Sequence, residues 1–410
     1  GEVAVGSGLS IDGTFTMGSN AVSLSGSLRT GSNGSFTASN IVTFNGEHIA
    51  RGISSNGSTL NNVVLNGTGS TWTLEDATDM NGTLSILAGT LSQGTSTLNV
   101  ADDFRIAKNA FFTKASNNAL LTFDGDLIIE DEAGLNIGDV QMGTSPDVIT
   151  MSGDLMTDNL TIGTGDTLIT NGYNLTVSGN LIIHGLLDAS DSGGRNSDIN
   201  VIGSWTASGT GDFIAGTSTV TFNGTSGNHN VTASGAFYNL VFSGTGASWT
   251  GTGDSIDVNG NFTLTNGTFT APDTITLSGT WLKSGGTFNH SSGTVLLDGT
   301  NQTVSGSTVF FSFTKTVTTS ETLTFAQGAQ QSFSGALTLL GVIGEELLIR
   351  SETNGQTTLF SLDTGGSANL QYLDVRDNDA SGGQSLLCTN CTDSGNNTNW
   401  IFSTSTIGGR

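Results

Sequence analysis

The sequence predicts an all-β protein, a parallel β-solenoid (β-helix) of about twenty coils, with an array of β-sandwich domains as the alternative. Three observations support this prediction. Helix-forming residues are scarce, because 59 of the 410 residues are Gly and only 11 are Lys or Arg. Apolar and polar residues alternate in short runs, as in strands with one buried face. These runs recur about every 20 residues, which is a typical repeat-protein signature.

The chain is strongly acidic but carries few charges of either sign. It has 35 Asp and Glu against 11 Lys and Arg, a formal net charge of −24, and no basic run. Nucleic-acid binding requires a basic surface, so the composition excludes nucleic acid as a partner. No apolar stretch approaches the ~18 residues of a membrane-spanning helix, so the sequence predicts no membrane span.

The short repeat is clearest between residues 181 and 295, where strand-like segments are centred 17 to 20 residues apart. Most of these segments end in Asn-Gly, Asp-Gly or Ser-Gly, because Gly and Asn form tight corners at low cost. The strands of a sandwich array would also show alternating apolar and polar residues, with turns about every 8–12 residues. A parallel solenoid stacks the same residue type at the same position of each coil, which the recurring Phe, Val and Leu favour.

The sequence also contains a longer, degenerate repeat of 75–100 residues, each copy of which spans several coils. Its four copies each carry one Phe shortly before a strand, at Phe36, Phe112, Phe213 and Phe288. Trp205 and Trp281 also occupy one slot of this repeat, and a second match aligns Trp72 with Trp249. We expect the four Phe side chains to point inward and to occupy equivalent positions in their coils.

The organisation expected from these repeats has three parts. Residues 1–345 form stacked coils, residues 346–402 form closing coils, and residues 403–410 form a tail. The first coils begin in mid-repeat without a charged cover or an amphipathic helix. We therefore expect that more chain or another subunit covers this end, and that the chain is part of a longer secreted protein.

One family resemblance follows from the coil formula. The segment Thr-Val-Thr-Phe-Asn-Gly-Thr at 219–225, followed by Phe-Tyr-Asn-Leu-Val-Phe at 237–242, resembles the repeats of large bacterial surface proteins. Those proteins are similar to the right-handed parallel β-helices of adhesins and pectin-lyase-like proteins, and residues 347–400 are similar to their closing coils. The resemblance implies a right-handed β-helix and an extracellular location, either secreted or on the cell surface.

Pectin-lyase-like proteins include polysaccharide lyases and hydrolases, which place acids and bases at one slot of neighbouring coils. The nearest approach to such a cluster is Asp102, Asp103 and Arg105 in one coil with Asp124 and Asp126 in the next. Asp124, however, occupies a turn slot that Asn holds in other coils, and no Arg or Lys set recurs at the coil spacing. The four His never pair at metal-ligand spacing. The sequence therefore predicts no catalytic site and no enzyme.

One acidic loop has the spacing of a calcium site. Asp377, Asp379 and Ser381 would supply oxygen ligands at positions 1, 3 and 5, with Gly382 at position 6. Position 12, where a bidentate Glu belongs, is Cys388. A hydrated turn is the alternative, and calcium is the one cofactor that the sequence suggests.

The two cysteines lie together in the segment Cys388-Thr-Asn-Cys391. Redox and zinc sites built on C-x-x-C need a βαβ context or a second ligand pair, and the sequence contains neither. We expect a local disulfide or two free thiols.

The function expected from these features is that of an extracellular structural or adhesive solenoid, a rigid acidic rod on the cell surface or a fibre subunit. Its partners would be other copies, joined end to end, or glycans. One alternative is a carbohydrate-active or polysaccharide-binding β-helix. Another is an ice- or mineral-binding solenoid, suggested by Thr-x-Thr steps such as Thr219/Thr221 but opposed by the scatter in coil length.

Overall fold

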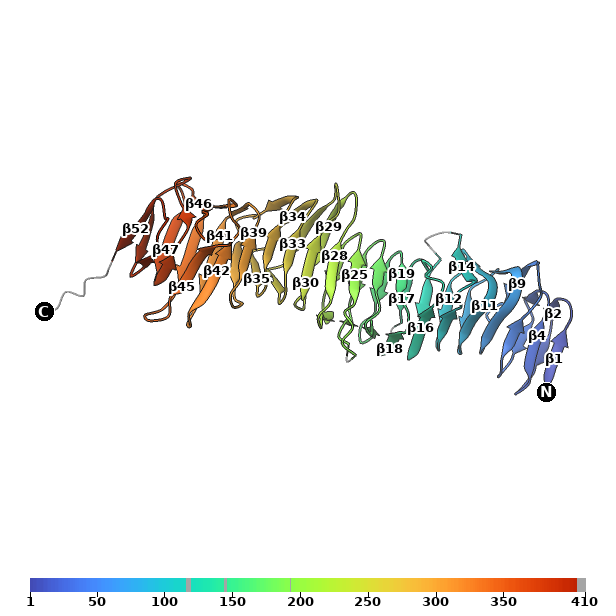
Figure 1. The fold of residues 1–410 in the computed structure, drawn as a ribbon. Helices are drawn as coiled ribbons and strands as arrows, with labels where there is room; N and C mark the ends of the chain where they lie inside the picture. The colour runs from blue at the N-terminus through green and yellow to red at the C-terminus, as the bar shows by residue number, and fades with distance from the viewer. Residues whose placement is uncertain (116–118, 144–145, 192, 404–410) are drawn as a thin grey trace. The chain divides into compact units, whose positions relative to one another are not determined.

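The fold is a stack of short parallel strands (Figure 1). The structure, a computed structural model, describes residues 1–115, 119–143, 146–191 and 193–403. The described residues form 52 strands and no helix, and the strands pair in parallel sheets that make a β-solenoid of about 18 turns. The predicted fold class is confirmed, with slightly fewer turns than expected. An array of sandwiches is excluded because β-sandwiches are built from antiparallel sheets.

The chain divides into two compact units, Gly1–Gly216 and Thr217–Arg410. The predicted closing coils, residues 346–402, belong to the second unit and form strands β45 (Leu347–Ser351) to β52 (Trp400–Ser403). Of the predicted tail, Ser403 ends β52, and residues 404–410 lie outside the described residues.

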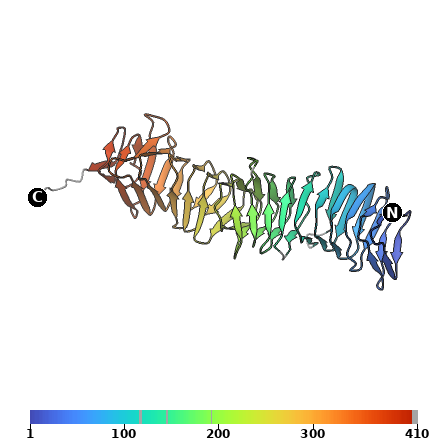
Figure 2. The same ribbon diagram turned by 90° about the horizontal axis from the view of Figure 1, so that it is seen from below.

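The first unit contains two large sheets and two smaller ones, whose strands follow in chain order in Figure 2. The β1–β27 sheet contains, in order, β1 (Glu2–Val5), β4 (Ala21–Leu24), β7 (Val42–Phe44), β9 (Val63–Leu74), β11 (Leu84–Gly94), β13 (Phe104–Ile106), β16 (Leu127–Asp131), β18 (Val148–Met151), β21 (Thr167–Ile169), β24 (Leu186–Asp188) and β27 (Asp212–Ile214). Branches of this sheet are β2 (Leu9–Ile11), β5 (Leu28–Thr30), β8 (Ala50–Ser54) and β14 (Ala110–Lys114). The β10–β26 sheet contains β10 (Thr78–Met80), β12 (Leu98–Val100), β15 (Leu121–Phe123), β17 (Val140–Met142), β20 (Leu160–Ile162), β23 (Leu181–Ile183) and β26 (Trp205–Ala207). The smaller sheets are β19 (Leu155–Thr157), β22 (Leu175–Val177) and β25 (Asp198–Val201), and β3 (Thr14–Thr16) with β6 (Ser35–Thr37).

The second unit has four sheets. The β28–β51 sheet contains β28 (Thr219–Phe222), β30 (Asn239–Phe242), β33 (Phe262–Leu264), β36 (Trp281–Lys283), β39 (Thr303–Ser305), β42 (Glu321–Phe325), β45, β48 (Leu373–Val375) and β51 (Thr392–Asp393). The β29–β37 sheet contains β29 (Asn228–Thr232), β31 (Ser248–Thr252), β34 (Thr268–Thr270) and β37 (Thr287–Asn289). The β32–β52 sheet contains β32 (Ser255–Val258), β35 (Thr274–Leu277), β38 (Thr294–Leu297), β41 (Ser312–Thr316), β44 (Ala336–Leu340), β47 (Ser367–Gln371), β50 (Leu386–Thr389) and β52. The fourth sheet contains β40 (Thr308–Phe310), β43 (Gln330–Phe333), β46 (Thr358–Leu362) and β49 (Asn378–Asp379).

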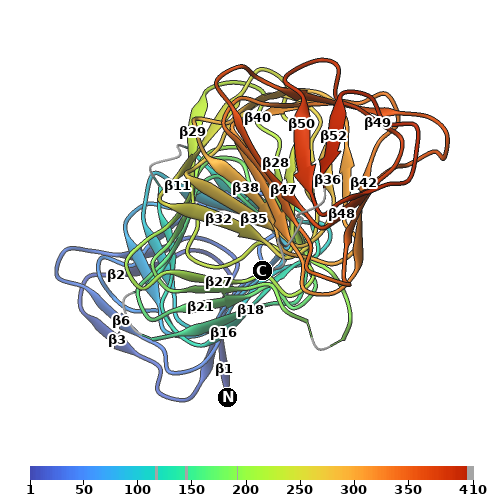
Figure 3. The ribbon, with the colours of Figure 1, turned by 90° about the vertical axis from the view of Figure 1, so that its left-hand side faces the viewer.

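A single coil passes through three strands before it returns to the first sheet. Strands β35, β36 and β37 follow one another, and β38 then returns beside β35 (Figure 3). This pairing places Val295 beside Ile275. Every second residue points inward, and Ile275, Trp281, Phe288 and Val295 are all buried. Burial of one such side chain stabilises the fold by about 1.5–3 kcal/mol. The alternating sequence pattern therefore builds a continuous apolar core inside the coils.

The four repeat phenylalanines are buried as predicted, with exposed fractions of 2% to 8%. They lie in the third strand of their copies: Phe36 in β6, Phe112 in β14, Phe213 in β27 and Phe288 in β37. In three copies the first strand pairs directly with the fourth, β4 with β7, β12 with β15 and β35 with β38. Each of these copies therefore begins one coil and returns to its first sheet. The matched segment of the long repeat corresponds to one coil, but its copies do not all start on the same sheet, since β4 and β12 belong to different sheets of the first unit.

The second sequence match also describes a shared packing arrangement. Trp72 packs on Phe44 with ring centroids 6.0 Å apart and an interplanar angle of 56°, and Trp249 packs on Phe222 at 6.0 Å and 50°. A Cβ on Gly67 would lie closer than 3.0 Å to Cη2 of Trp72, and a Cβ on Gly244 closer than 3.0 Å to Cη2 of Trp249. Gly is required at both positions because the indole ring fills the space of a side chain.

Candidate functional site

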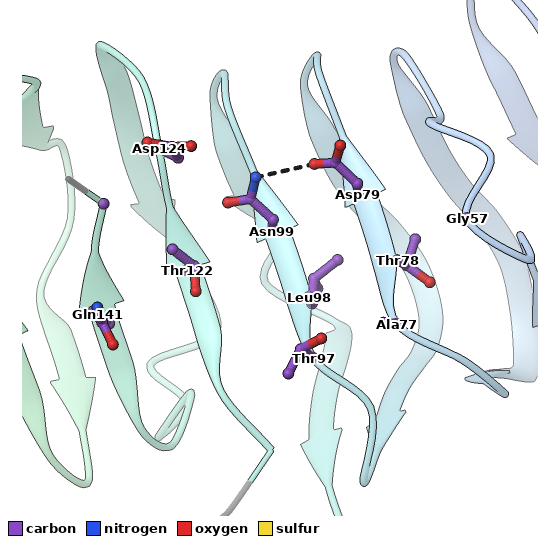
Figure 4. Close-up of a pocket in the computed structure, with 11 residues that line it drawn as sticks. Gly57, Ala77, Thr78, Asp79, Thr97, Leu98, Asn99, Thr122, Asp124 and Gln141 are labelled. Atoms are coloured by element: carbon purple, nitrogen blue, oxygen red, sulfur yellow. Dashed lines mark hydrogen bonds between the residues drawn. The ribbon is translucent and has the colours of Figure 1, made fainter. Parts of the chain in front are cut away.

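The strongest candidate binding site is an open groove of about 520 Å³ in the first unit (Figure 4). It crosses β10, β12, β15 and β17 of the β10–β26 sheet. The lining residues are Gly57, Ala77, Thr78, Asp79, Thr97, Leu98, Asn99, Thr122, Asp124, Gln141 and Gly143.

A polar column forms the centre of the groove because the strands pair in register. Asp79 lies beside Asn99, Asn99 beside Thr122, and Thr122 beside Gln141. Each is the middle residue of a three-residue strand whose two outer residues are buried, so its side chain points outward. Asn99 Nδ2 donates a hydrogen bond of 3.0 Å to Asp79 Oδ1, and this contact orients both side chains (Figure 4).

The groove can bind a ligand that both donates and accepts hydrogen bonds. Its lining has two carboxylates, Asp79 and Asp124, two side-chain amides and several hydroxyl groups. The described lining residues include no Lys, Arg or His. This charge balance disfavours an acidic polysaccharide and favours a neutral or amino-bearing ligand.

The acids and the base that the sequence grouped near residues 102–126 do not all meet in one cleft. Asp103 and Arg105 line one groove together with Glu130. Arg105 forms ion pairs with Glu130 at 2.8 Å and Glu132 at 3.1 Å on the β1–β27 sheet. Asp124 lines the groove on the other large sheet. The expected cluster is therefore divided between two faces of the coil.

The remaining acids of that cluster hold the backbone. Asp103 Oδ1 accepts a 2.8 Å hydrogen bond from the N–H of Ile128, and Asp126 Oδ1 accepts one of 2.7 Å from Val148. The coil spacing of 17 to 20 residues did not indicate these partners of Arg105, because Glu130 lies 25 residues away.

The chain matches no protein-family model, no curated protein and no solved structure. Strand pairing alone establishes the solenoid. The resemblance to bacterial surface proteins thus remains an expectation. Within the described ranges, no helix is long and apolar enough to cross a membrane.

Three side-chain oxygens of the predicted calcium loop already have protein partners. Asp377 is buried, its Oδ2 accepts a 3.0 Å hydrogen bond from Gly355 N–H, and its Oδ1 accepts one of 2.7 Å from Asn396 Nδ2. Burial raises the pKa of Asp377, but these hydrogen bonds and the Arg376 guanidinium outweigh it and lower the pKa overall. Asp379 Oδ1 accepts the Ser381 N–H at 2.9 Å.

This geometry is that of a hydrogen-bonded turn. Over the ranges that the structure describes, no three His, Cys, Asp or Glu side chains converge as a metal site. Calcium binding at Asp377, Asp379 and Ser381 stays a prediction. Nearby, Cys388 and Cys391 form a disulfide, the first of the two expected states.

Two further polar columns run along the outward face of the β29–β37 sheet. Their rungs are Asn228/Asn230, Ser248/Thr250, Thr268/Thr270 and Thr287/Asn289. The inward residues between them include Trp249 and Phe269, both fully buried. By contrast, Thr219 and Thr221 pair with Asn239 and Val241. The Thr-x-Thr pattern of this strand is therefore not repeated on the neighbouring strand.

These columns have a nearly constant spacing in the sequence. From Asn228 to Ser248, Thr268 and Thr287, successive rungs lie 20, 20 and 19 residues apart. Backbone hydrogen bonds hold the neighbouring strands about 4.8 Å apart, so the columns form a regular polar surface.

Proposed function

We propose that this chain is an extracellular structural or adhesive β-solenoid that binds through its polar sheet faces, to glycans or to other copies of itself. The observation that carries the proposal is the eight-position array on β29, β31, β34 and β37, in which every outward side chain is Asn, Ser or Thr. Such an array offers many equivalent hydrogen-bonding groups at a regular spacing. Repeated weak contacts of this kind add up to strong attachment by multivalency.

The central test removes hydroxyl groups from this face without changing side-chain shape. The variant carries Thr250→Val and Thr270→Val, and binding to immobilised polysaccharides and to bacterial cells is measured. We expect a loss of at least fivefold in apparent affinity. The matched control carries Thr221→Val and Thr263→Val, on the outward face of the β28–β51 sheet, and should bind as the unmodified chain does. Equal binding by all three proteins would contradict the proposal.

A second candidate function is polysaccharide binding in the groove of the first unit. The Asp79–Asn99–Thr122–Gln141 column supports it, because its amides and hydroxyl groups match the hydrogen-bonding groups of a sugar chain lying across the strands. Titration calorimetry with neutral, acidic and amino polysaccharides tests it. Asn99→Ala should weaken binding of a neutral or amino polysaccharide, and Thr250→Val, in the other unit, should leave that binding unchanged.

A further inference from the structure

Two buried carboxylates stack at one corner of the first unit. Asp147 directly precedes β18 and Asp166 directly precedes β21, and these strands pair with Val148 beside Thr167. Asp147 is 9% exposed and Asp166 is 0% exposed. The Asp147 N–H donates a 3.2 Å hydrogen bond to Asp166 Oδ1, so the two residues lie in direct contact.

One oxygen of each carboxylate has no hydrogen-bond partner in the described part of the chain. Asp147 Oδ2 and Asp166 Oδ2 are both buried, and neither has a hydrogen bond among the residues described. A buried ionised oxygen without a partner is strongly unfavourable, and two such groups side by side also repel one another. This corner therefore requires a counter-charge.

The charged side chains that shift the pKa of these two acids are themselves carboxylates. Burial is the largest cause of the raised pKa of both Asp147 and Asp166, and Asp124 raises both further. Asp126 adds to the effect on Asp147. No cationic side chain contributes to either shift.

Carbonyl oxygens converge on the same corner. A Cβ on Gly163 would lie closer than 3.0 Å to both Asp166 Oδ2 and the carbonyl oxygen of Gly143, with the carbonyl oxygen of Met142 at 3.2 Å. Asp166 Oδ2 and the carbonyl oxygen of Gly143 therefore both lie beside the Gly163 Cα, where no larger residue fits. An all-oxygen set of carboxylates and backbone carbonyls is the donor set that Ca²⁺ prefers, at about 2.3–2.6 Å and with water completing the shell.

We propose that Ca²⁺ binds at this corner, held by Asp166 Oδ2, the carbonyl oxygen of Gly143 and the Asp147 carboxylate. The site uses two acidic side chains and backbone oxygen, so it differs in composition from a three-carboxylate cluster. It is also distinct from the loop at Asp377. The bound ion supplies the counter-charge for two buried acids and joins successive coils of the first unit.

The test uses the full chain, freed of metal with a chelator and titrated with CaCl₂. Calorimetry counts the sites, and thermal unfolding measures stabilisation, which follows ligand binding to the folded state. We expect Asp166→Asn to remove one equivalent of bound Ca²⁺ or to weaken that site at least tenfold. Asp154→Asn, an exposed corner acid that accepts the Asn174 N–H, is the matched control and should bind as the unmodified chain does.

Asp379→Asn separates this site from the sequence-predicted loop, because it should leave the Asp166 site intact. If Asp166→Asn does not fold, Asp147→Asn provides the second variant, with the same expected loss. An unmodified chain that neither binds nor is stabilised by Ca²⁺ would overturn the proposal. A calcium-binding isotherm for Asp166→Asn identical to that of the unmodified chain would also overturn it. The same holds if lowering the pH alone stabilises the metal-free chain, because a proton would then be the counter-charge.

Discussion

Trp281 and Phe288 pack edge to face inside one coil, with ring centroids 4.9 Å apart and an interplanar angle of 81°. Trp205 and Phe213, the corresponding pair of another repeat copy, pack at 4.9 Å and 74°. The rings of a pair come from the second and third strands of their copy. Edge-to-face pairs add about 0.5–1.5 kcal/mol beyond the burial of their area. The long repeat therefore preserves a packing contact across one corner of the coil.

The repeat phenylalanines should dominate local stability. Phe112 is 3% exposed and contacts Phe104 edge to face at 5.8 Å. Its neighbour Phe111 points outward and is 52% exposed. Phe112→Ala should cost about 3–5 kcal/mol in chemical denaturation, as expected for a buried Phe. Phe111→Ala removes the same atoms from the adjacent position and should cost under about 0.5 kcal/mol. Equal losses would refute the inward assignment.

The two Gly–Trp contacts should tolerate no methyl group. Gly67→Ala and Gly244→Ala would each drive a Cβ into an indole ring and a backbone carbonyl of the preceding coil. Overpacking of this kind costs about 1–3 kcal/mol. The expected result is a lower unfolding temperature with a shifted tryptophan emission spectrum. Gly13→Ala, where a Cβ would meet nothing within 4 Å, is the control and should leave both readouts unchanged.

Stability should rise between about pH 8 and 10.5 because of one half-buried cation, Lys114. Burial lowers the pKa of Lys114 from 10.5 to about 8, although Asp139 and Asp158 act to raise it. Between about pH 8 and 10.5 the unfolded chain therefore binds more protons at this residue than the folded chain, so this residue contributes increasing stability as the pH rises. Lys114→Met should remove that contribution and stabilise the protein at pH 7.

Denaturation midpoints across pH 7 to 10.5 measure the effect. The control is Lys108→Met, which removes the same charge from an exposed position and should retain the pH profile of the unmodified chain. A pH profile for Lys114→Met that parallels the unmodified chain would contradict the prediction.

Self-association should respond to ionic strength. We propose that copies join end to end and that the charge of −24 keeps them apart sideways at low salt. Because the screening length falls from about 30 Å at 0.01 M salt to about 10 Å at 0.1 M, lateral bundling should increase with NaCl. Analytical ultracentrifugation and electron microscopy across a salt series measure this. One monodisperse mass at every salt and protein concentration would remove polymerisation from the proposed function.

The sequence by itself determined the period of the coils and the residues that point inward. The long repeat assigned Phe36, Phe112, Phe213 and Phe288 to the core, because each copy carries one Phe at the same position before a strand. The local disulfide was also among the expected states, because Cys388 and Cys391 lie three residues apart.

Only the tertiary structure decided which outward residues share a surface. The register joined Asp79 to Asn99 across 20 residues but Arg105 to Glu130 across 25, and it stacked Asp147 on Asp166 at one corner. The physical reason is that corners of different length feed strands whose spacing the backbone hydrogen bonds keep constant. The core depends on alternation within a strand, which a sequence displays directly. The groove column and the Arg105–Glu130 pair depend on pairing between coils, which unequal corners conceal.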